Sequence, residues 1–288
     1  MSTTRRQFLA SGAAMALAGR LGRAAEARPR FTVAMVSDTH LGRKGSESPG
    51  RWMRQAVAEI NGSAAELTIF LGDLVDTGAK NEARYPEWVG IARGLKRPWY
   101  AVPGNHDPEA LFRKYVRPKT DCAVDHKGVR FVCFQDTRTD SHQGTVTREQ
   151  LAWIAGQVHG AATKGLRVVL CAHITAHPNK HPDVGWWVRS GGKEVRELLA
   201  ANRDTVAACL SGHFHCGCRG WSDAGGVHEV VVPSTCWNRD RGLDKAPGFA
   251  LKEFRRSYVV LEVHAERLVL SCKPLGAEPV ASRALALG

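Results

Sequence analysis

The sequence of 288 residues lacks a long apolar run, an internal repeat and a block of basic residues. After residue 27 no stretch approaches the roughly 20 apolar residues that a membrane-spanning helix requires, so we expect no transmembrane segment. The formal net charge is +12, but Lys and Arg are scattered along the chain. This distribution favours small phosphate-bearing partners and gives no indication of nucleic-acid binding. No Pro-, Gly- or Ser-rich linker interrupts residues 28–288, which we interpret as one domain.

The first 27 residues have the pattern of an export signal. Adjacent Arg5 and Arg6 precede a weakly apolar stretch from Phe8 to Ala18, and small residues follow up to Ala27. This order resembles a twin-arginine signal peptide cleaved after Ala27, with the twin-arginine export machinery as a partner. The alternatives are a basic tail and an amphipathic helix. We expect the remaining chain, residues 28–288, to be periplasmic or otherwise exported.

Histidine and cysteine cluster in "SGHFHCGCRG", residues 211–220, among eight cysteines in the whole chain. By itself this stretch fits a zinc knuckle, a disulfide hairpin or one corner of a larger site. A bridge between Cys216 and Cys218 would close a small, strained ring, so two thiols are the favoured interpretation. Cys133 and Cys171 lie inside apolar runs, where a cysteine packs as a small hydrophobe.

Short apolar runs alternate with amphipathic segments along most of the chain. Helices are expected at 50–61, 82–94, from Thr147 (a capping box with Gln150) and around 195–199. The runs typical of strands are 31–37, 67–72, 97–104, 129–135, 166–173, 205–212, 228–233 and the hairpin 257–263 with 267–272. Strands that alternate with helices, followed by strands alone, indicate an α/β fold with mixed sheets.

Polar side chains of the kind that bind metals follow five of these strands directly. They are Asp38 and His40, then Asp73, then Asn105 with His106, then His173, and finally His213 with His215. The carboxyl edge of an α/β sheet is where ligands bind, and the glycines before Asp73, Asn105 and His213 suit sharp turns. One such residue is weak evidence, but five in this order predict a shared site.

Asp-x-His, Gly-Asp, Gly-Asn-His-Asp, a lone His and Gly-His-x-His, in this order, resemble the calcineurin-like metallophosphoesterase family over residues 31–272. "GDLVDTG" and "QLAWI" resemble the branch of cyclic-nucleotide and glycerophosphodiester phosphodiesterases. The resemblance implies a four-layer α/β/β/α sandwich of two mixed sheets, with a metal site at the carboxyl ends of the strands.

The resemblance also implies two adjacent transition-metal ions, from among Mn, Fe, Zn and Co. Carboxylate, amide and imidazole ligands suit these ions, so the cysteines are not needed. His177 of "AHITAHP" is the alternative to His173. The first ion would be held by Asp38, His40, Asp73 and His215, and the second by Asp73 as the bridge with Asn105, His173 and His213.

A metal-bound hydroxide would attack the phosphate ester, as in other two-metal sites. Asn105 and His106 would face the phosphate, and the resemblance implies that His106 protonates the leaving oxygen or steadies the phosphoryl group. Asp76 would orient His106; the alternatives are a surface turn for His106 and a helix N-cap for Asp76. Trp186 and Trp187, in an expected loop over 177–192, would form a substrate wall or pack on the core.

The protein serine/threonine phosphatases of this superfamily have a phosphate-binding arginine where this sequence has Thr77. Its absence favours a diester substrate with one negative charge over a monoester with two. We therefore expect an exported, dinuclear metal-dependent phosphodiesterase. The alternatives are a phosphomonoesterase acting on small phosphates and a metal-binding scaffold without catalysis.

Overall fold

The computed structural model describes residues 28–43, 49–178, 185–222, 225–242 and 248–287. The expected export signal therefore lies outside the described residues. Among the described helices, none is both long and apolar enough to cross a membrane. The helices are α2 (Pro49–Asn61), α3 (Arg84–Ala92), α4 (Glu109–Tyr115), α5 (Arg148–Ala162) and α6 (Gly192–Ala201), with a 3₁₀ turn η1 (Gly78–Lys80).

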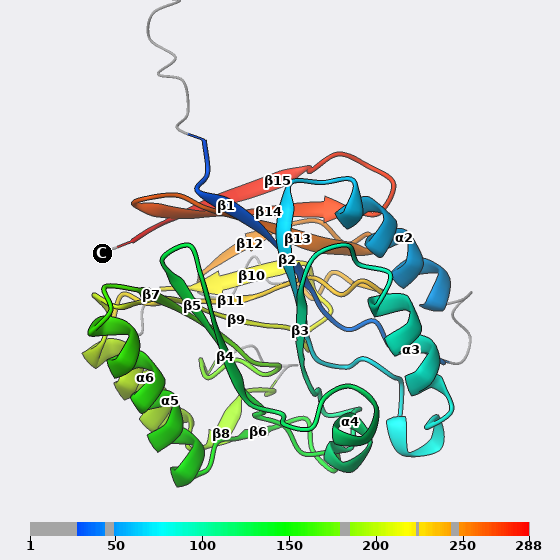
Figure 1. Ribbon diagram of the computed structural model, residues 1–288, viewed down its shortest axis with the longest axis horizontal. Coiled ribbons are helices and arrows are strands. Elements are labelled where there is room, and N and C mark those ends of the chain that lie inside the picture. Colours follow the sequence, from blue (N-terminus) through cyan, green and yellow to red (C-terminus); the bar gives the residue numbers. More distant parts are fainter. Residues whose placement is uncertain (1–27, 44–48, 179–184, 223–224, 243–247, 288) are drawn as a thin grey trace, which may run out of the picture.

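Two mixed sheets form the centre of the molecule (Figure 1). The first has the order β15 (Ala281–Ala286), β14 (Arg267–Pro274), β13 (Ser257–Val263), β1 (Phe31–Val36), β2 (Ala65–Leu71) and β3 (Trp99–Val102). The second has the order β12 (Phe249–Leu251), β10 (Cys218–Trp221), β11 (His228–Val231), β9 (Val206–Ser211), β7 (Arg167–Cys171), β5 (Val129–Cys133) and β4 (Cys122–His126).

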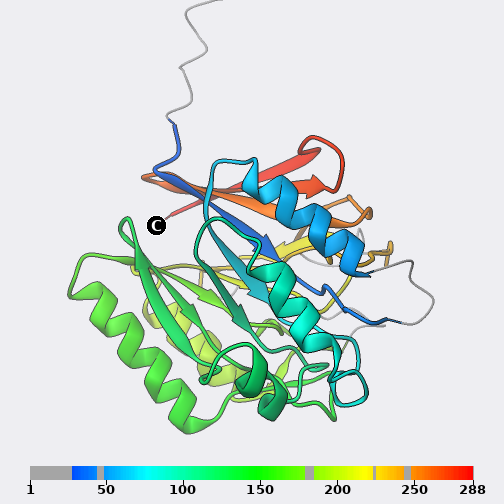
Figure 2. The same cartoon turned by 45° about the vertical axis from the view of Figure 1, so that its right-hand side comes forward.

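Apolar residues fill three layers between these elements. One core lies between the two sheets and includes Val33, Phe131 and Leu261. A second packs α2 and α3 against the outer face of the first sheet, and a third packs α5 and α6 against the second sheet. Figures 1 and 2 show the two helix pairs on opposite sides of the sheets. The expected four-layer sandwich is confirmed.

Local signals in the sequence correspond to local structure. Thr147 Oγ1 accepts a hydrogen bond from the Gln150 backbone N–H, and Gln150 Oε1 accepts one from the Thr147 N–H, both at 3.2 Å. This capping box begins α5. The predicted hairpin is the antiparallel pair β13–β14. All eight cysteines are free thiols, and Cys133 and Cys171 are buried between the sheets.

Several short elements have no counterpart among those expected from the sequence. Strands β4, β12 and β15 are sheet edges, where apolar alternation is weak. In β10, Arg219 and Gly220 interrupt the apolar pattern. Part of the loop expected at 177–192 is strand β8 (Val188–Ser190), which pairs with β6 (Gly144–Thr145), while residues 179–184 lie outside the described part. Helix α4 also has no counterpart.

The parallel strands bring their carboxyl ends to one edge. In the first sheet the Asp38 N–H donates to Gly72 O at 3.0 Å, which joins the ends of β1 and β2. In the second sheet the Gly212 N–H donates to His173 O at 3.0 Å, which joins β9 and β7. The His213 N–H donates across the sandwich to Asp38 Oδ2 at 3.0 Å. The motifs of both sheets therefore meet.

Candidate metal centre

Two groups of buried carboxylates and imidazoles occupy this edge. In each group the ligand-type atoms lie within 4.8 Å of one another. One group is Asp38, His40, Asp73 and His215, and the other is Asp73, His173 and His213. A further group, which is less buried, contains His40, Asp76 and His106.

Asp73 belongs to both buried groups. Its Oδ2 lies 3.4 Å from His40 Nε2 and 3.4 Å from His173 Nε2. Its Oδ1 accepts a hydrogen bond from the His106 backbone N–H at 2.9 Å. One carboxylate is therefore fixed between two clusters of ligands, which is the position of a bridging ligand.

Each of the four histidines in the two buried groups has one ring nitrogen beside an oxygen outside the clusters. An N–H on that nitrogen leaves a lone pair on the other, which points into the cluster; this is how metal-binding histidines are oriented. The outward contacts are His40 Nδ1 to Asp76 Oδ1 (3.0 Å), His173 Nδ1 to Leu71 O (2.6 Å), His213 Nε2 to His142 O (3.2 Å) and His215 Nδ1 to Trp237 O (2.9 Å).

The inward nitrogens face one another. His40 Nε2 lies 3.1 Å from His215 Nε2, and His173 Nε2 lies 3.2 Å from His213 Nδ1. Two lone pairs at this distance repel unless a cation lies beside them. Asn105 Oδ1 is also buried, and among the described residues it has no hydrogen-bond partner. A buried amide oxygen without a donor is costly, so these residues fit a bound metal.

The charge balance leads to the same conclusion. Burial would raise the pKa of Asp73, but His173, His40 and His106 outweigh it and hold the pKa well below its ordinary value. Burial would lower the pKa of His173, but the carboxylates of Asp73 and Asp38 raise it to about 10. The buried carboxylates thus require a positive charge between them, which is supplied by a proton or by a metal ion.

Left-handed backbone conformations are concentrated at this site. Asp38, His40, Asp73, His213 and His215 all have φ between 42° and 76°. Such conformations cost about 1–3 kcal/mol each in residues other than glycine and gather at functional sites. The strain is tolerated because it turns each side chain from its strand end toward the shared centre.

Two glycines leave space for side chains of the site that pack directly against their backbone. A Cβ on Gly104 would overlap the Asp73 carboxylate, and one on Gly212 would overlap Ser37 and Asp38. Only glycine permits these close approaches. The glycines predicted beside the motifs thus make room for neighbouring ligand side chains.

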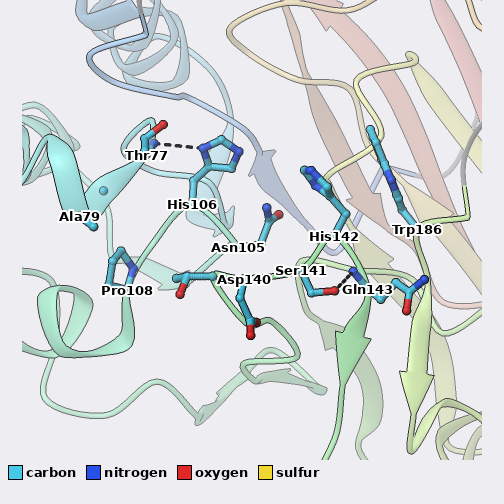
Figure 3. A pocket seen from close by; sticks show the side chains of 12 residues that line it. Thr77, Ala79, Asn105, His106, Pro108, Asp140, Ser141, His142, Gln143 and Trp186 are labelled. Carbon is cyan, nitrogen blue, oxygen red and sulfur yellow. Dashed lines mark hydrogen bonds between the residues drawn. The ribbon is translucent and has the colours of Figure 1, made fainter.

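His106 and Asp76 each have a hydrogen-bond partner that the sequence did not indicate. Nδ1 of His106 accepts a hydrogen bond from the Thr77 backbone N–H at 3.0 Å (Figure 3). Asp76 Oδ1 lies farther from this nitrogen, at 3.5 Å, and its hydrogen bond is with His40. Asp76 therefore orients His40 more directly than His106. With Nδ1 as acceptor, neutral His106 has its proton on Nε2.

A cavity of about 590 Å³ opens beside His106 and Asn105. It runs between Thr77–Ala79 on one side and Thr139–Gln143 with Trp186 on the other (Figure 3). A smaller cavity of about 170 Å³ continues over the imidazoles of both clusters. The site is thus open to a substrate with groups on two sides.

The structure distinguishes between paired candidates. Trp186 lines both cavities, whereas Trp187 packs against the Arg189 guanidinium, which lies 3.5 Å from its ring centre. His173 lies in the second cluster, whereas the ring of His177 stacks on Trp221 at 4.7 Å.

Other residues at the site had no signal in the sequence. His142 stacks on Trp186 at 4.8 Å and lines both cavities. Asp136 follows strand β5 and accepts hydrogen bonds from the N–H groups of His173 and Ile174. Neither belongs to a motif, because each is brought to the site by loop packing.

The sandwich and its two clusters of buried carboxylates and imidazoles define a metal-dependent hydrolase. The model of the calcineurin-like phosphoesterase family matches residues 31–217, and the chain belongs to this family. It is therefore a metallophosphoesterase.

The chain is similar to several known proteins. It is 27% identical to a cAMP/cGMP dual specificity phosphodiesterase of Mycobacterium tuberculosis, in an alignment 292 positions long that covers 89% of this chain and 83% of that protein. It is 26% identical over 203 residues to a probable glycerophosphodiester phosphodiesterase of Arcobacter nitrofigilis, covering 64% and 71%. A dimetal phosphatase of Danio rerio shares the fold, with a TM-score of 0.68 at 13% identity and coverage of 90% and 100%.

Proposed function

We propose that this chain is an exported phosphodiesterase that holds two transition-metal ions, in which residues 28–288 form one domain. The main supporting observation is that two cavities, of about 590 Å³ and about 170 Å³, both reach His106, because a diester has a substituent on each side of phosphorus. The similar proteins named as phosphodiesterases support the same substrate class. Export rests on the order of residues up to Ala27.

The ligand sets follow from the two clusters. Bound metal ions would supply Lewis acidity to the phosphoryl oxygens and lower the pKa of a bound water. The chain contributes the positions: Asp73 lies between the clusters, and Asn105 presents its unsatisfied oxygen at their edge. The proposed ligands are Asp38, His40, Asp73 and His215 for one ion and Asp73, Asn105, His173 and His213 for the other.

His106 acts as a hydrogen-bond donor in this proposal. Because the Thr77 N–H donates to its Nδ1, neutral His106 carries its proton on Nε2, where it can donate a hydrogen bond to a phosphoryl oxygen. Of the two roles implied for His106, the hydrogen bond thus favours steadying the phosphoryl group over protonating the leaving oxygen.

The missing arginine at Thr77 is weaker support for a diester than the sequence suggested. The smaller cavity is lined by two other arginines, Arg43 and Arg241, so positive side chains do reach the site. The shape of the cavity is therefore stronger support for a diester substrate than the absence of an arginine at position 77.

Matched aryl phosphate monoesters and diesters test the substrate class. With protein loaded with Mn, Fe, Co or Zn in turn, we expect kcat/KM for the diester to exceed that for the monoester. A clear preference for the monoester with every metal would contradict the proposed substrate class.

A further inference from the structure

Two tryptophans each join one histidine of the Gly-His-x-His motif to an arginine. Trp237 stacks on His215 at 4.2 Å, and the Arg43 guanidinium lies 5.0 Å from the Trp237 ring centre. Trp186 packs on His213 at 4.9 Å, and the Arg241 guanidinium lies 5.1 Å from the Trp186 ring centre. Within each unit, the tryptophan and the arginine come from loops far apart in the sequence. All four of these tryptophans and arginines line the same small cavity.

Both arginines are tied to the backbone of the metal motifs. The backbone N–H of Arg43 donates to His40 O at 3.1 Å. Arg241 Nε donates to Phe214 O, between the two histidines of the motif, at 2.9 Å. The Arg241 guanidinium is therefore held beside the motif by its own hydrogen bond, whereas the Arg43 guanidinium lies near the Trp237 ring and Asp76.

Within the described part of the chain, Arg43 has little negative charge to balance it. Its side chain is 37% exposed, and its ion pair is with Asp76 at 4.0 Å. The shorter contact of that carboxylate is with His40 at 3.0 Å. A guanidinium that lies over an indole ring still presents its edge N–H groups, and their planar arrangement matches a phosphate or carboxylate.

We propose that Arg43 and Arg241 form a subsite for a second anionic group, so that the preferred diester has a phosphate or carboxylate on the part that is not cleaved. The inference rests on the proposed phosphodiesterase function. The scissile phosphoryl group is held at the clusters with Asn105 and His106, and the arginines lie at the tryptophans that flank these clusters. A substrate anchored at the clusters thus brings its substituent to the small cavity that both arginines line.

The test uses 4-nitrophenyl alkyl phosphates that share one scissile bond. The alkyl chain has two to six carbons and ends in a methyl, carboxylate, phosphate or trimethylammonium group. The measured quantity is the ratio of kcat/KM for the anionic chain to that for the methyl chain, in metal-loaded protein. The variants are Arg43→Gln, Arg43→Lys and Arg241→Gln. Arg54→Gln, on the exposed face of α2, is the matched control for the loss of one charge.

We expect the wild type to prefer an anionic chain over methyl, and methyl over trimethylammonium, at one or more lengths. Arg43→Gln and Arg241→Gln should each lower the ratio roughly 10- to 100-fold, the effect of one hydrogen bond to a charged group. Arg43→Lys should recover part of it, and Arg54→Gln should leave it unchanged. Whether carboxylate or phosphate is preferred identifies the anion.

Two results would overturn the subsite. One is a wild-type ratio near one at every chain length, and the other is a ratio that Arg43→Gln and Arg241→Gln leave unchanged. Either can occur while the methyl diester is hydrolysed, in which case the phosphodiesterase function stands without the subsite. If the methyl diester is not hydrolysed although a matched monoester is, the proposed function itself fails.

Discussion

Replacement of Glu229 by Gln tests how one buried carboxyl group makes the stability of the protein depend on pH. This carboxyl group contacts the loop that carries His173. Glu229 lies in β11 and is 1% exposed. Its Oε2 accepts hydrogen bonds from Thr175 Oγ1 at 3.1 Å and from the His177 N–H at 2.8 Å. A glutamine oxygen can accept both of these bonds, so the substitution changes the charge and keeps the contacts.

The pKa gives the size of the effect. Burial raises the pKa of Glu229 from an ordinary value of 4.5 to about 7. Between these values the folded protein keeps a proton that the unfolded chain releases, so the free energy of unfolding falls as the pH rises from about 4.5 to about 7. The difference between the two pKa values corresponds to roughly 3 kcal/mol. Glutamine does not ionise and should avoid this loss.

Urea unfolding at pH 5 and at pH 8 measures the effect, with metal-free protein at both values. Glu229→Gln should be close to the wild type at pH 5 and more stable by roughly 3 kcal/mol at pH 8. Glu197→Gln, on the exposed face of α6, is the control for the loss of one negative charge. The reasoning would be refuted if the stability of Glu229→Gln, relative to the wild type, rose from pH 5 to pH 8 by no more than that of this control.

Other predictions concern the site and the export signal. Asp73→Ala should lose both metal ions by elemental analysis, because its carboxylate lies between the clusters; a fully loaded variant would contradict the bridging role. Asp76→Asn should weaken metal affinity roughly 10- to 100-fold through His40, measured by titration with a chelator; unchanged affinity would contradict this role. His106→Ala should keep its metals and lose roughly 10²–10³-fold in kcat, by a similar factor for good and poor leaving groups, whereas a loss confined to poor leaving groups would show that it protonates the leaving oxygen. Exchange of Arg5 and Arg6 for lysine should leave precursor in the cytoplasm, as seen by cell fractionation, and normal export would exclude the twin-arginine route.

The sequence by itself was enough to predict an α/β fold with mixed sheets and the side chains at its edge, and the family resemblance implied the four-layer sandwich. The residue after a strand lies at the carboxyl end of that strand, and strands joined through helices run parallel, so these ends share one edge of the sheet. Asp73 and His213 were identified in this way, and the capping box at Thr147 depends on only four consecutive residues.

Contacts between loops were decided by the tertiary structure alone. The hydrogen bond of Asp76 goes to His40, and Thr77 supplies the donor to His106. Which hydrogen bond forms depends on differences of a few tenths of an ångström in distance. The loops concerned follow different strands, so these distances are set by how the strands pack. Arg43 and Trp237, which meet over His215, are almost two hundred residues apart and follow no repeated spacing. A sequence pattern cannot predict such a pair, because only the packing of one sheet on the other brings their loops together.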